Sequence, residues 1–193
     1  MELEQQDITS EEPLPDELIE ILCAEMPEFV NDDSSVNWED FLDEPSYVEK
    51  ALMIANAAHL GQRGKSGRIG EPYFFHCLRV MMRGKDDEEK AVGVLHDALE
   101  DTDVTARELL QEGIPLHIVQ AVVAISHKPG EPRVDYYERL KQNDLALRVK
   151  RYDLDDNTDP ERMALLDKET KRRLTKKYKK AYSLLYGEDW KPA

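Results

Sequence analysis

The sequence predicts an all-α protein, and three observations support this fold class. From residue 46 onward, apolar side chains recur at helical intervals in nearly every segment, without the alternation typical of strands. A serine or threonine followed three residues later by glutamate, the spacing of a capping box, occurs at Ser46–Glu49 and Thr105–Glu108. Glycine and proline fall between the periodic segments, where loops are expected.

The first half of the periodic region is divided by caps and acidic first turns. A helix over about residues 46–61 begins at the first capping box, and Pro72 opens the next, over Tyr73–Met82. The four acids of residues 86–89 stand where the helix macrodipole favours negative charge. We expect the helix that they begin to run unbroken to Asp101.

The second half continues with shorter helices. Thr105 begins one that Gly113 ends, and Pro115 leads into a strongly apolar helix. Two further helices are expected over Val134–Gln142 and Asp144–Tyr152.

The last two helices are predicted from a cap and from a basic amphipathic pattern. Asp159 is an N-cap followed by a proline at the first helical position. A basic amphipathic helix is expected over about Lys168–Tyr186. Its run Lys176–Lys180 is interpreted as a solvated face, with attraction of substrate phosphates as the alternative.

Charge divides the chain into an arm and a domain. Residues 1–44 contain 16 acids and no lysine or arginine, whereas residues 45–193 carry 25 acids and 26 bases. We interpret residues 1–44 as an acidic, partly ordered N-terminal arm and residues 45–193 as one domain with a sizeable core. The arm either solubilises the chain or binds a basic partner, including its own basic C-terminal helix. The net charge of −15 gives nucleic-acid binding no support.

Cysteine usage and hydropathy indicate a cytoplasmic protein. Cys23 and Cys77 are too few for a disulfide scaffold, so a reducing compartment is expected. No apolar run reaches the roughly 18 residues that a membrane span needs. The N-terminus is acidic, unlike that of a signal peptide. We therefore expect no membrane partner.

Residues 61–76, GQRGKSGRIGEPYFFH, contain Gly64-Lys65-Ser66, which matches the end of a phosphate-binding loop motif, but the rest of that motif is missing. A P-loop needs a glycine five residues before Gly64 and a strand leading into the loop. His59 occupies that position, and the preceding residues are predicted to be helical. The dinucleotide-binding fingerprint fails because its glycines have a different spacing. We interpret this segment as the wall of another kind of site.

A histidine and three carboxylates cluster in LHDALEDT, residues 95–102. On a continuous helix, His96 and Glu100 stand one turn apart, as do Asp97 and Asp101. Apolar neighbours should shield part of this set, and burying unpaired carboxylates is costly unless a cation is bound. The alternative interpretation is a solvated helix end with incidental acids.

A second polar segment is VKRYDLDDN, residues 149–157. Its aspartates lie at a helix C-terminus, where the macrodipole disfavours negative charge. A bound cation would relieve this conflict. Salt bridges to Lys150, Arg151 and Arg162 are the alternative.

The segments AAHLGQ, GEPYFFH, VGVLHDALEDT and VKRYDLDDN together resemble the HD-domain metal-dependent phosphohydrolases. More narrowly, they resemble the hydrolase domain of the RelA/SpoT family and the small stand-alone alarmone hydrolases. The resemblance covers about residues 47–160 and implies an HD-domain helical bundle. The segment after residue 125 follows the family only loosely, and the loop before GEPY is longer than its commonest form.

The resemblance implies a role for each matching residue. The implied metal ligands are His76, His96, Asp97 and Asp153, a mixed nitrogen and oxygen set that suits a divalent ion, in this family typically Mn²⁺. Glu100 and Asp101 match the acidic pair that positions and deprotonates the attacking water. Asn157 matches a residue that contacts the substrate nucleotide. The corresponding basic loop contacts base or phosphate, so the candidates for that contact are Arg63, Lys65, Ser66 and Arg68.

The implied reaction is hydrolysis of the 3′ ester of guanosine tetra- or pentaphosphate, (p)ppGpp, with release of pyrophosphate. Where relatives often carry Leu-His-Asn, this chain has LDDN at residues 154–157, which would change the charge beside the nucleotide. One alternative keeps the metal site but acts on a nucleoside monophosphate or another phosphorylated nucleotide. Another is a non-enzymatic interaction protein with an acidic arm. The intact set of histidines and acids argues against that last alternative.

Other polar and aromatic residues have more ordinary interpretations. His59 is expected to pack or to support the site rather than bind metal. Tyr136, Tyr137 and Arg139 are expected to pack in the core, with the nucleotide pocket as the alternative. Cys77 lacks the paired spacing of a zinc site and is expected to be buried.

Overall fold

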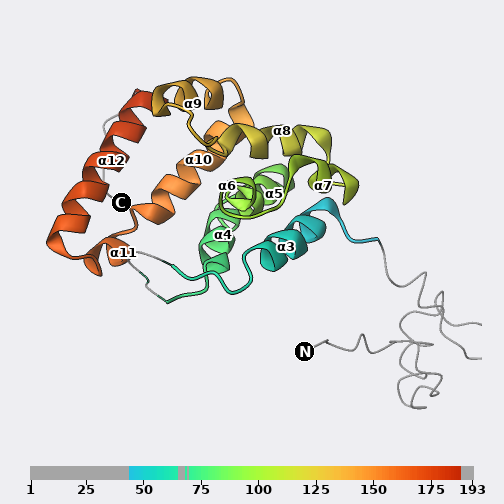
Figure 1. Cartoon of the computed structure of the whole chain (residues 1–193), viewed down its shortest axis with the longest axis horizontal. Helices are drawn as coiled ribbons and strands as arrows, with labels where there is room; N and C mark the ends of the chain where they lie inside the picture. The colour runs from blue at the N-terminus through green and yellow to red at the C-terminus, as the bar shows by residue number, and fades with distance from the viewer. Residues whose placement is uncertain (1–43, 65–67, 69, 188–193) are drawn as a thin grey trace, which may run out of the picture. The chain divides into compact units, whose positions relative to one another are not determined.

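The computed structural model describes residues 44–64, 68 and 70–187, and their regular secondary structure is helical (Figure 1). The helices are α3 (Tyr47–Ala58), α4 (Phe74–Met81), α5 (Asp87–Leu95), α6 (Ala98–Asp101), α7 (Ala106–Gln111), α8 (Leu116–Ile125), α9 (Arg133–Leu140), α10 (Asp144–Asn157), α11 (Pro160–Ala164) and α12 (Lys168–Tyr186). Apart from helices, the described ranges contain one isolated antiparallel bridge, between Arg63 and Pro72. The all-α prediction is confirmed.

The chain divides by its internal contacts after Glu44, and the architecture below is that of the unit Pro45–Ala193. The acidic arm predicted for residues 1–44 lies outside the described residues except for Glu44. Its order and its partner stay predictions.

Helix α5 is the centre of the core. It packs against α3, α4, α8 and α10 (Figure 1). Its residues Ala91, Val92, Val94 and Leu95 are fully buried. Gly93 lets α4 approach closely, because a Cβ atom there would lie 3.0 Å from Cα of Met81. This tight packing fixes α4, which carries His76, against α5, which ends beside His96.

The predicted caps are present. Ser46 and Thr105 each form a complete capping box with the glutamate three residues later. Asp159 accepts a hydrogen bond from the backbone of Arg162 and precedes Pro160 at the start of α11. Helix α12 has the bounds expected from its amphipathic pattern and ends at Gly187, whose φ of 64° suits glycine.

Two predicted helix bounds are wrong. The helix expected to run unbroken to Asp101 ends at Leu95, and α6 begins after a turn at His96 and Asp97. Asp97, with φ −102° and ψ −1°, accepts with its carbonyl oxygen from the amide of Asp101. Because of this turn, His96 and Asp97 lie at the end of α5 and not on one face of a continuous helix. The other error is α10, which continues past Tyr152 to Asn157.

Helix α12 is an outer element of this unit. Figure 1 shows it extending from α11 at one end to α9 at the other, beyond α10. Its apolar side buries Leu174, Tyr178, Tyr182 and Leu185. No described helix is long and apolar enough to cross a membrane.

Candidate metal centre and its cleft

Two histidines and two aspartates from three parts of the fold converge at one point. His76 comes from α4, His96 and Asp97 from the turn between α5 and α6, and Asp153 from α10. Nε2 of His76 lies 3.2 Å from Oδ1 of Asp153 and 3.7 Å from Oδ2 of Asp97. Nε2 of His96 lies 2.9 Å from the same Asp97 oxygen and 3.7 Å from Asp153. The structure thus brings together all four residues predicted as metal ligands.

Hydrogen bonds on the far side of each ring turn Nε2 toward this point. Nδ1 of His96 lies 2.8 Å from the carbonyl oxygen of Gly93, which can only accept, so Nδ1 carries the proton. Nδ1 of His76 lies 2.7 Å from the buried carboxylate of Asp156, to which it donates. Each ring therefore directs its Nε2 atom toward the two carboxylates. A histidine held in this way by a carboxylate or carbonyl is the usual arrangement around a protein-bound metal.

The cluster carries excess negative charge. Burial alone would lower the pKa of His96, but Asp97 and Asp153 raise it to about 10. Burial also opposes the charged form of His76, yet Asp153 and Asp156 raise its pKa. The site therefore favours a cation between these groups.

The donor set fits a divalent metal ion. Nitrogen or oxygen atoms of His76, His96 and Asp97 lie within 4.8 Å of one another, close enough to share one ion. Nε2 of His96 is buried and makes no well-aligned hydrogen bond, although Oδ2 of Asp97 lies 2.9 Å away. A cation bound between this nitrogen and the carboxylate would satisfy both groups.

Three neighbouring side chains hold the aspartates. The hydroxyl of Tyr73 donates to Oδ2 of Asp97 at 2.5 Å. Lys150, which is mostly buried, lies 2.8 Å from Oδ2 of Asp153, and Asn157 donates to Oδ1 of that residue at 2.5 Å. These contacts fix the carboxylates in place before any ligand arrives.

The acidic pair Glu100 and Asp101 lies at the edge of the centre, on α6. Both residues are exposed, and both line a cavity that Asp97 and Asp153 also line. Glu100 is held through Oε2, which accepts from the backbone amide of His127 at 2.9 Å. The carbonyl oxygen of Asp101 accepts from the side chain of Gln62 at 2.9 Å.

His59 supports this edge from within the fold. It is buried, and its Nδ1 lies 2.9 Å from Oε1 of Gln62, the residue whose amide nitrogen holds Asp101. Its ring also packs against Tyr73, with 5.2 Å between centroids. The expectation that His59 packs near the site rather than joining the cluster agrees with this position.

The glycine-rich loop forms one wall of the cleft. Arg63, Gly64 and Arg68 line a cavity of about 600 Å³, together with His76, Asp101 and Asn157. Lys65 and Ser66 lie outside the described residues. A Cβ atom on Gly64 would lie 2.7 Å from the carbonyl oxygen of Arg68, so the loop closes tightly at this glycine. Arg68 is partly engaged, with Asp159 and Glu161 at 3.6 and 3.7 Å.

A second cavity, of about 210 Å³, adjoins the first at the metal cluster. Both are lined by Tyr73, Asp101, Asn157, Lys177 and Tyr178. The smaller one also contacts Asp97 and Asp153. The two cavities form one cleft, and the cluster lies where they meet.

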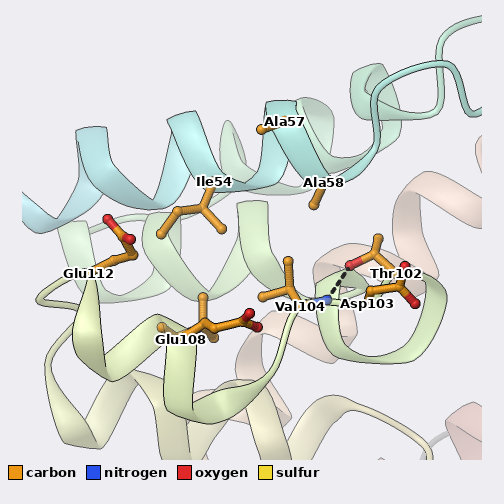
Figure 2. A pocket seen from close by; sticks show the side chains of 9 residues that line it. Ile54, Ala57, Ala58, Thr102, Asp103, Val104, Glu108 and Glu112 are labelled. Carbon is orange, nitrogen blue, oxygen red and sulfur yellow. Dashed lines mark hydrogen bonds between the residues drawn. The ribbon is translucent and has the colours of Figure 1, made fainter.

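Another hollow, of about 500 Å³, lies between α3, α7 and the loop that joins α6 to α7, as Figure 2 shows. Its lining is apolar and acidic, including Ile54, Val104, Glu108 and Glu112, and contains no histidine, lysine or arginine. It shares no lining residue with the cleft. Because an anionic ligand would be repelled by acids, the cleft at the cluster is the better candidate for a phosphorylated compound.

Two tyrosines, an arginine and a cysteine considered in the sequence also lie near the cleft or in the core. Tyr136 and Tyr137 are buried, and both also line the smaller cavity. Arg139 does not line the cleft and instead holds the loop after α8. Cys77 is buried and free, as expected.

Sequence reasoning missed the support for His76. Asp156 is 1% exposed and joins His76 to Arg79, whose Nε donates to Oδ1 of Asp156 at 2.8 Å. Arg79 also makes two hydrogen bonds with Glu71, at 3.0 and 3.1 Å. Asp156 therefore faces a predicted ligand, not the nucleotide side of the cleft as the LDDN segment suggested.

The contacts that hold Asp153, by contrast, could have been predicted from the sequence. Lys150, Asp153 and Asn157 have helical spacing, so their contacts follow from α10 alone. Arg79 and Asp156 are far apart in the chain, so no local pattern could have paired them.

Comparison with known proteins agrees with the geometry. No family model matches the chain. A guanosine-3′,5′-bis(diphosphate) 3′-pyrophosphohydrolase of Borreliella burgdorferi is 41% identical over 69 residues, which cover 34% of this chain and 10% of the relative. A GTP pyrophosphokinase of Myxococcus xanthus is 33% identical over 102 residues, which cover 50% of this chain and 13% of the relative.

A solved structure shares the fold. It is described as a metazoan ortholog of SpoT that hydrolyzes ppGpp and plays a role in starvation responses. The TM-score is 0.63 at 21% identity, and the match covers 77% of this chain and 90% of that one. The chain resembles the RelA/SpoT-type HD hydrolase domain. The chain matches only about a tenth of the length of these curated RelA/SpoT-type relatives.

Proposed function

We propose that the chain is a metal-dependent hydrolase that removes the 3′ diphosphate of (p)ppGpp as pyrophosphate. The observation that carries this proposal is the convergence of His76, His96, Asp97 and Asp153 at the meeting point of two cavities. The names of the relatives and of the structural neighbour support the choice of substrate. The two cysteines and the composition keep a reducing cytoplasm as the proposed compartment.

The metal would be held by these four side chains, and Mn²⁺ is the ion that we propose. Imidazole nitrogens and carboxylate oxygens together suit a divalent first-row ion. Such an ion, when bound, lowers the pKa of a coordinated water and offsets negative charge on phosphoryl oxygens.

The chain's own residues supply position and proton transfer. Asp101 and Glu100 lie at the edge of the cluster, where a carboxylate can accept the proton of the attacking water. Glu100 is fixed by the backbone of His127, whereas Asp101 lines both cavities. We therefore assign the general base to Asp101 and the positioning of the water to Glu100.

The walls of the cleft would hold the nucleotide. Arg63 and Arg68 face the larger cavity from the glycine-rich loop, with Lys65 and Ser66 proposed to continue this surface. Asn157 lines both cavities and donates to Asp153, and we assign it a contact with the substrate. Guanidinium groups suit this position because they bind phosphate with paired hydrogen bonds and also stack on bases.

The test is hydrolysis of ppGpp by the purified protein with Mn²⁺, following GDP and pyrophosphate by ion-exchange chromatography. We expect turnover that requires the metal and falls by at least about 10³-fold in Asp97→Ala, because a ligand to the catalytic ion is removed. Arg172→Ala, an exposed change on α12 away from the cleft, is the matched control for handling. Metal bound at one equivalent without turnover would contradict the substrate, and turnover undiminished in Asp97→Ala would contradict the site.

A further inference from the structure

Three basic side chains border the cleft where α9 faces α12. Arg173 lines the larger cavity, Arg133 lines the smaller, and Lys177 lines both. The same three residues line a third hollow, of about 320 Å³, whose lining residues all belong to α9 and α12. They therefore surround the point where the cleft opens along α12.

Like Arg63, and unlike the other described cations of the cleft, these three residues have no carboxylate within 4.0 Å. The basic residues that do lie within 4.0 Å of a carboxylate are Arg68, Arg79, Lys150 and Arg162. Within the described part of the chain, Arg133, Arg173 and Lys177 form no ion pair. Their positive charge is therefore available to an anionic ligand.

Lys177 borders the cavity that Asp97 and Asp153 also line. Its amine lies 5.4 Å from the centroid of the Tyr178 ring, on a residue that lines both cavities. Partial burial, with repulsion from Arg133 and Lys150, lowers the pKa of Lys177. Like charges held together at the edge of a cleft favour the binding of an anion.

We propose that Arg133, Arg173 and Lys177 form a subsite for a second anionic group of the substrate, a phosphate or diphosphate other than the one cleaved. The inference rests on the proposed function and adds a requirement to it. The metal cluster takes the scissile group, and the α12 subsite takes an anion at the other end of the same nucleotide. A nucleoside with phosphates on both its 5′ and 3′ oxygens meets this requirement, whereas a nucleoside monophosphate does not.

The experiment compares two substrates that differ only at the second anion. These are ppGpp and guanosine 3′-diphosphate with a free 5′ hydroxyl, each assayed with Mn²⁺ at constant ionic strength. For ppGpp, kcat/KM should fall about tenfold or more in Arg173→Gln and in Lys177→Gln, because each removes a charge-assisted hydrogen bond to phosphate. For the 3′-diphosphate, which has nothing to place in the subsite, the same variants should change kcat/KM less than about threefold.

Arg172→Gln is the matched control, since Arg172 is a neighbouring exposed cation on α12 that borders none of the three hollows. It should leave the ratio between the two substrates unchanged. Equal losses on both substrates, or no loss on ppGpp, would overturn the subsite while leaving the proposed function in place. A wild-type protein that cleaves neither nucleotide would overturn the proposed function, and the subsite with it.

Discussion

Two polar clusters in this domain, one half-buried around Arg139 and one buried around His96, differ in how completely their hydrogen bonds are satisfied. The guanidinium of Arg139 bonds to both carboxylate oxygens of Glu131 and to the carbonyl oxygens of Val123, Ala124 and Ser126. At the metal cluster, Nε2 of His96 makes no well-aligned hydrogen bond, although Oδ2 of Asp97 lies 2.9 Å away. The first cluster is complete without a ligand, and the second is not.

The difference separates a structural role from a binding role. Arg139 ties the loop after α8 to α9, and that loop supplies the His127 amide that holds Glu100. The metal cluster instead concentrates two carboxylates beside two imidazoles at the meeting point of two cavities. A buried polar group that is left incomplete in a cleft is a sign of a missing ligand.

Removing Arg139 should show the structural role. Arg139→Met leaves Glu131 and three carbonyl groups without their donor, so we expect a loss of about 2–4 kcal/mol in the free energy of unfolding. Urea denaturation followed by circular dichroism would measure it. Metal stoichiometry should be unchanged, and a loss below about 1 kcal/mol would show that water replaces the guanidinium without difficulty.

Neutralising Asp156 should instead weaken metal binding. In Asp156→Asn, the side chain keeps its shape but loses the charge that orients His76 and increases its basicity, so Mn²⁺ affinity should fall about 10- to 100-fold. Isothermal titration calorimetry on the metal-free protein would give the affinity.

The matched control for that change is Asp155→Asn. Asp155 is the preceding residue and bonds to Tyr182, not to a predicted ligand. We expect its Mn²⁺ affinity to match that of the wild type. Similar losses in the two variants would mean that general negative charge, not the contact with His76, sets the affinity.

The smallest expected effect is in acid. Hydrogen bonds from Arg139 lower the pKa of Glu131 to about 2. Because the pKa of this carboxyl is lower in the folded than in the unfolded protein, its contribution to stability is complete above about pH 4.5 and is lost as pH falls toward 2. Glu131→Gln should therefore flatten the fall in unfolding free energy over this range, as measured by urea midpoints at pH 5, 4 and 3.

Glu138→Gln is the comparison for the acid experiment, because Glu138 lies on α9 beside Arg139, is exposed and accepts a hydrogen bond from Lys141. Its acid dependence should follow the wild type. An unaltered slope in Glu131→Gln would contradict the role given to the Arg139 pair.

The sequence predicted the parts of the fold that depend on neighbouring residues. Ser46, Thr105 and Asp159 act as caps because capping needs only the next three residues, and α12 follows from its own pattern. The break at His96–Asp97 was missed because the apolar pattern continues through it and the turn is fixed by tertiary packing.

The same limit applies to the site. His76, His96, Asp97 and Asp153 were predicted through the resemblance of their motifs, and the structure brings them together. Their supporting contacts, Tyr73 to Asp97 and Asp156 to His76, join distant parts of the chain, so no local sequence pattern predicts them. The run Lys176–Lys180 was interpreted as a solvated face, with attraction of substrate phosphates as the alternative, because sequence alone does not show that α12 borders the cleft.

The central claim is that one metal ion completes the polar cluster, and anomalous X-ray scattering tests it most directly. Crystals of the protein grown with Mn²⁺ would be measured on both sides of the manganese absorption edge. The account predicts a single strong anomalous peak within coordination distance of His76, His96, Asp97 and Asp153. A peak elsewhere, or no peak among these side chains at saturating Mn²⁺, would contradict it.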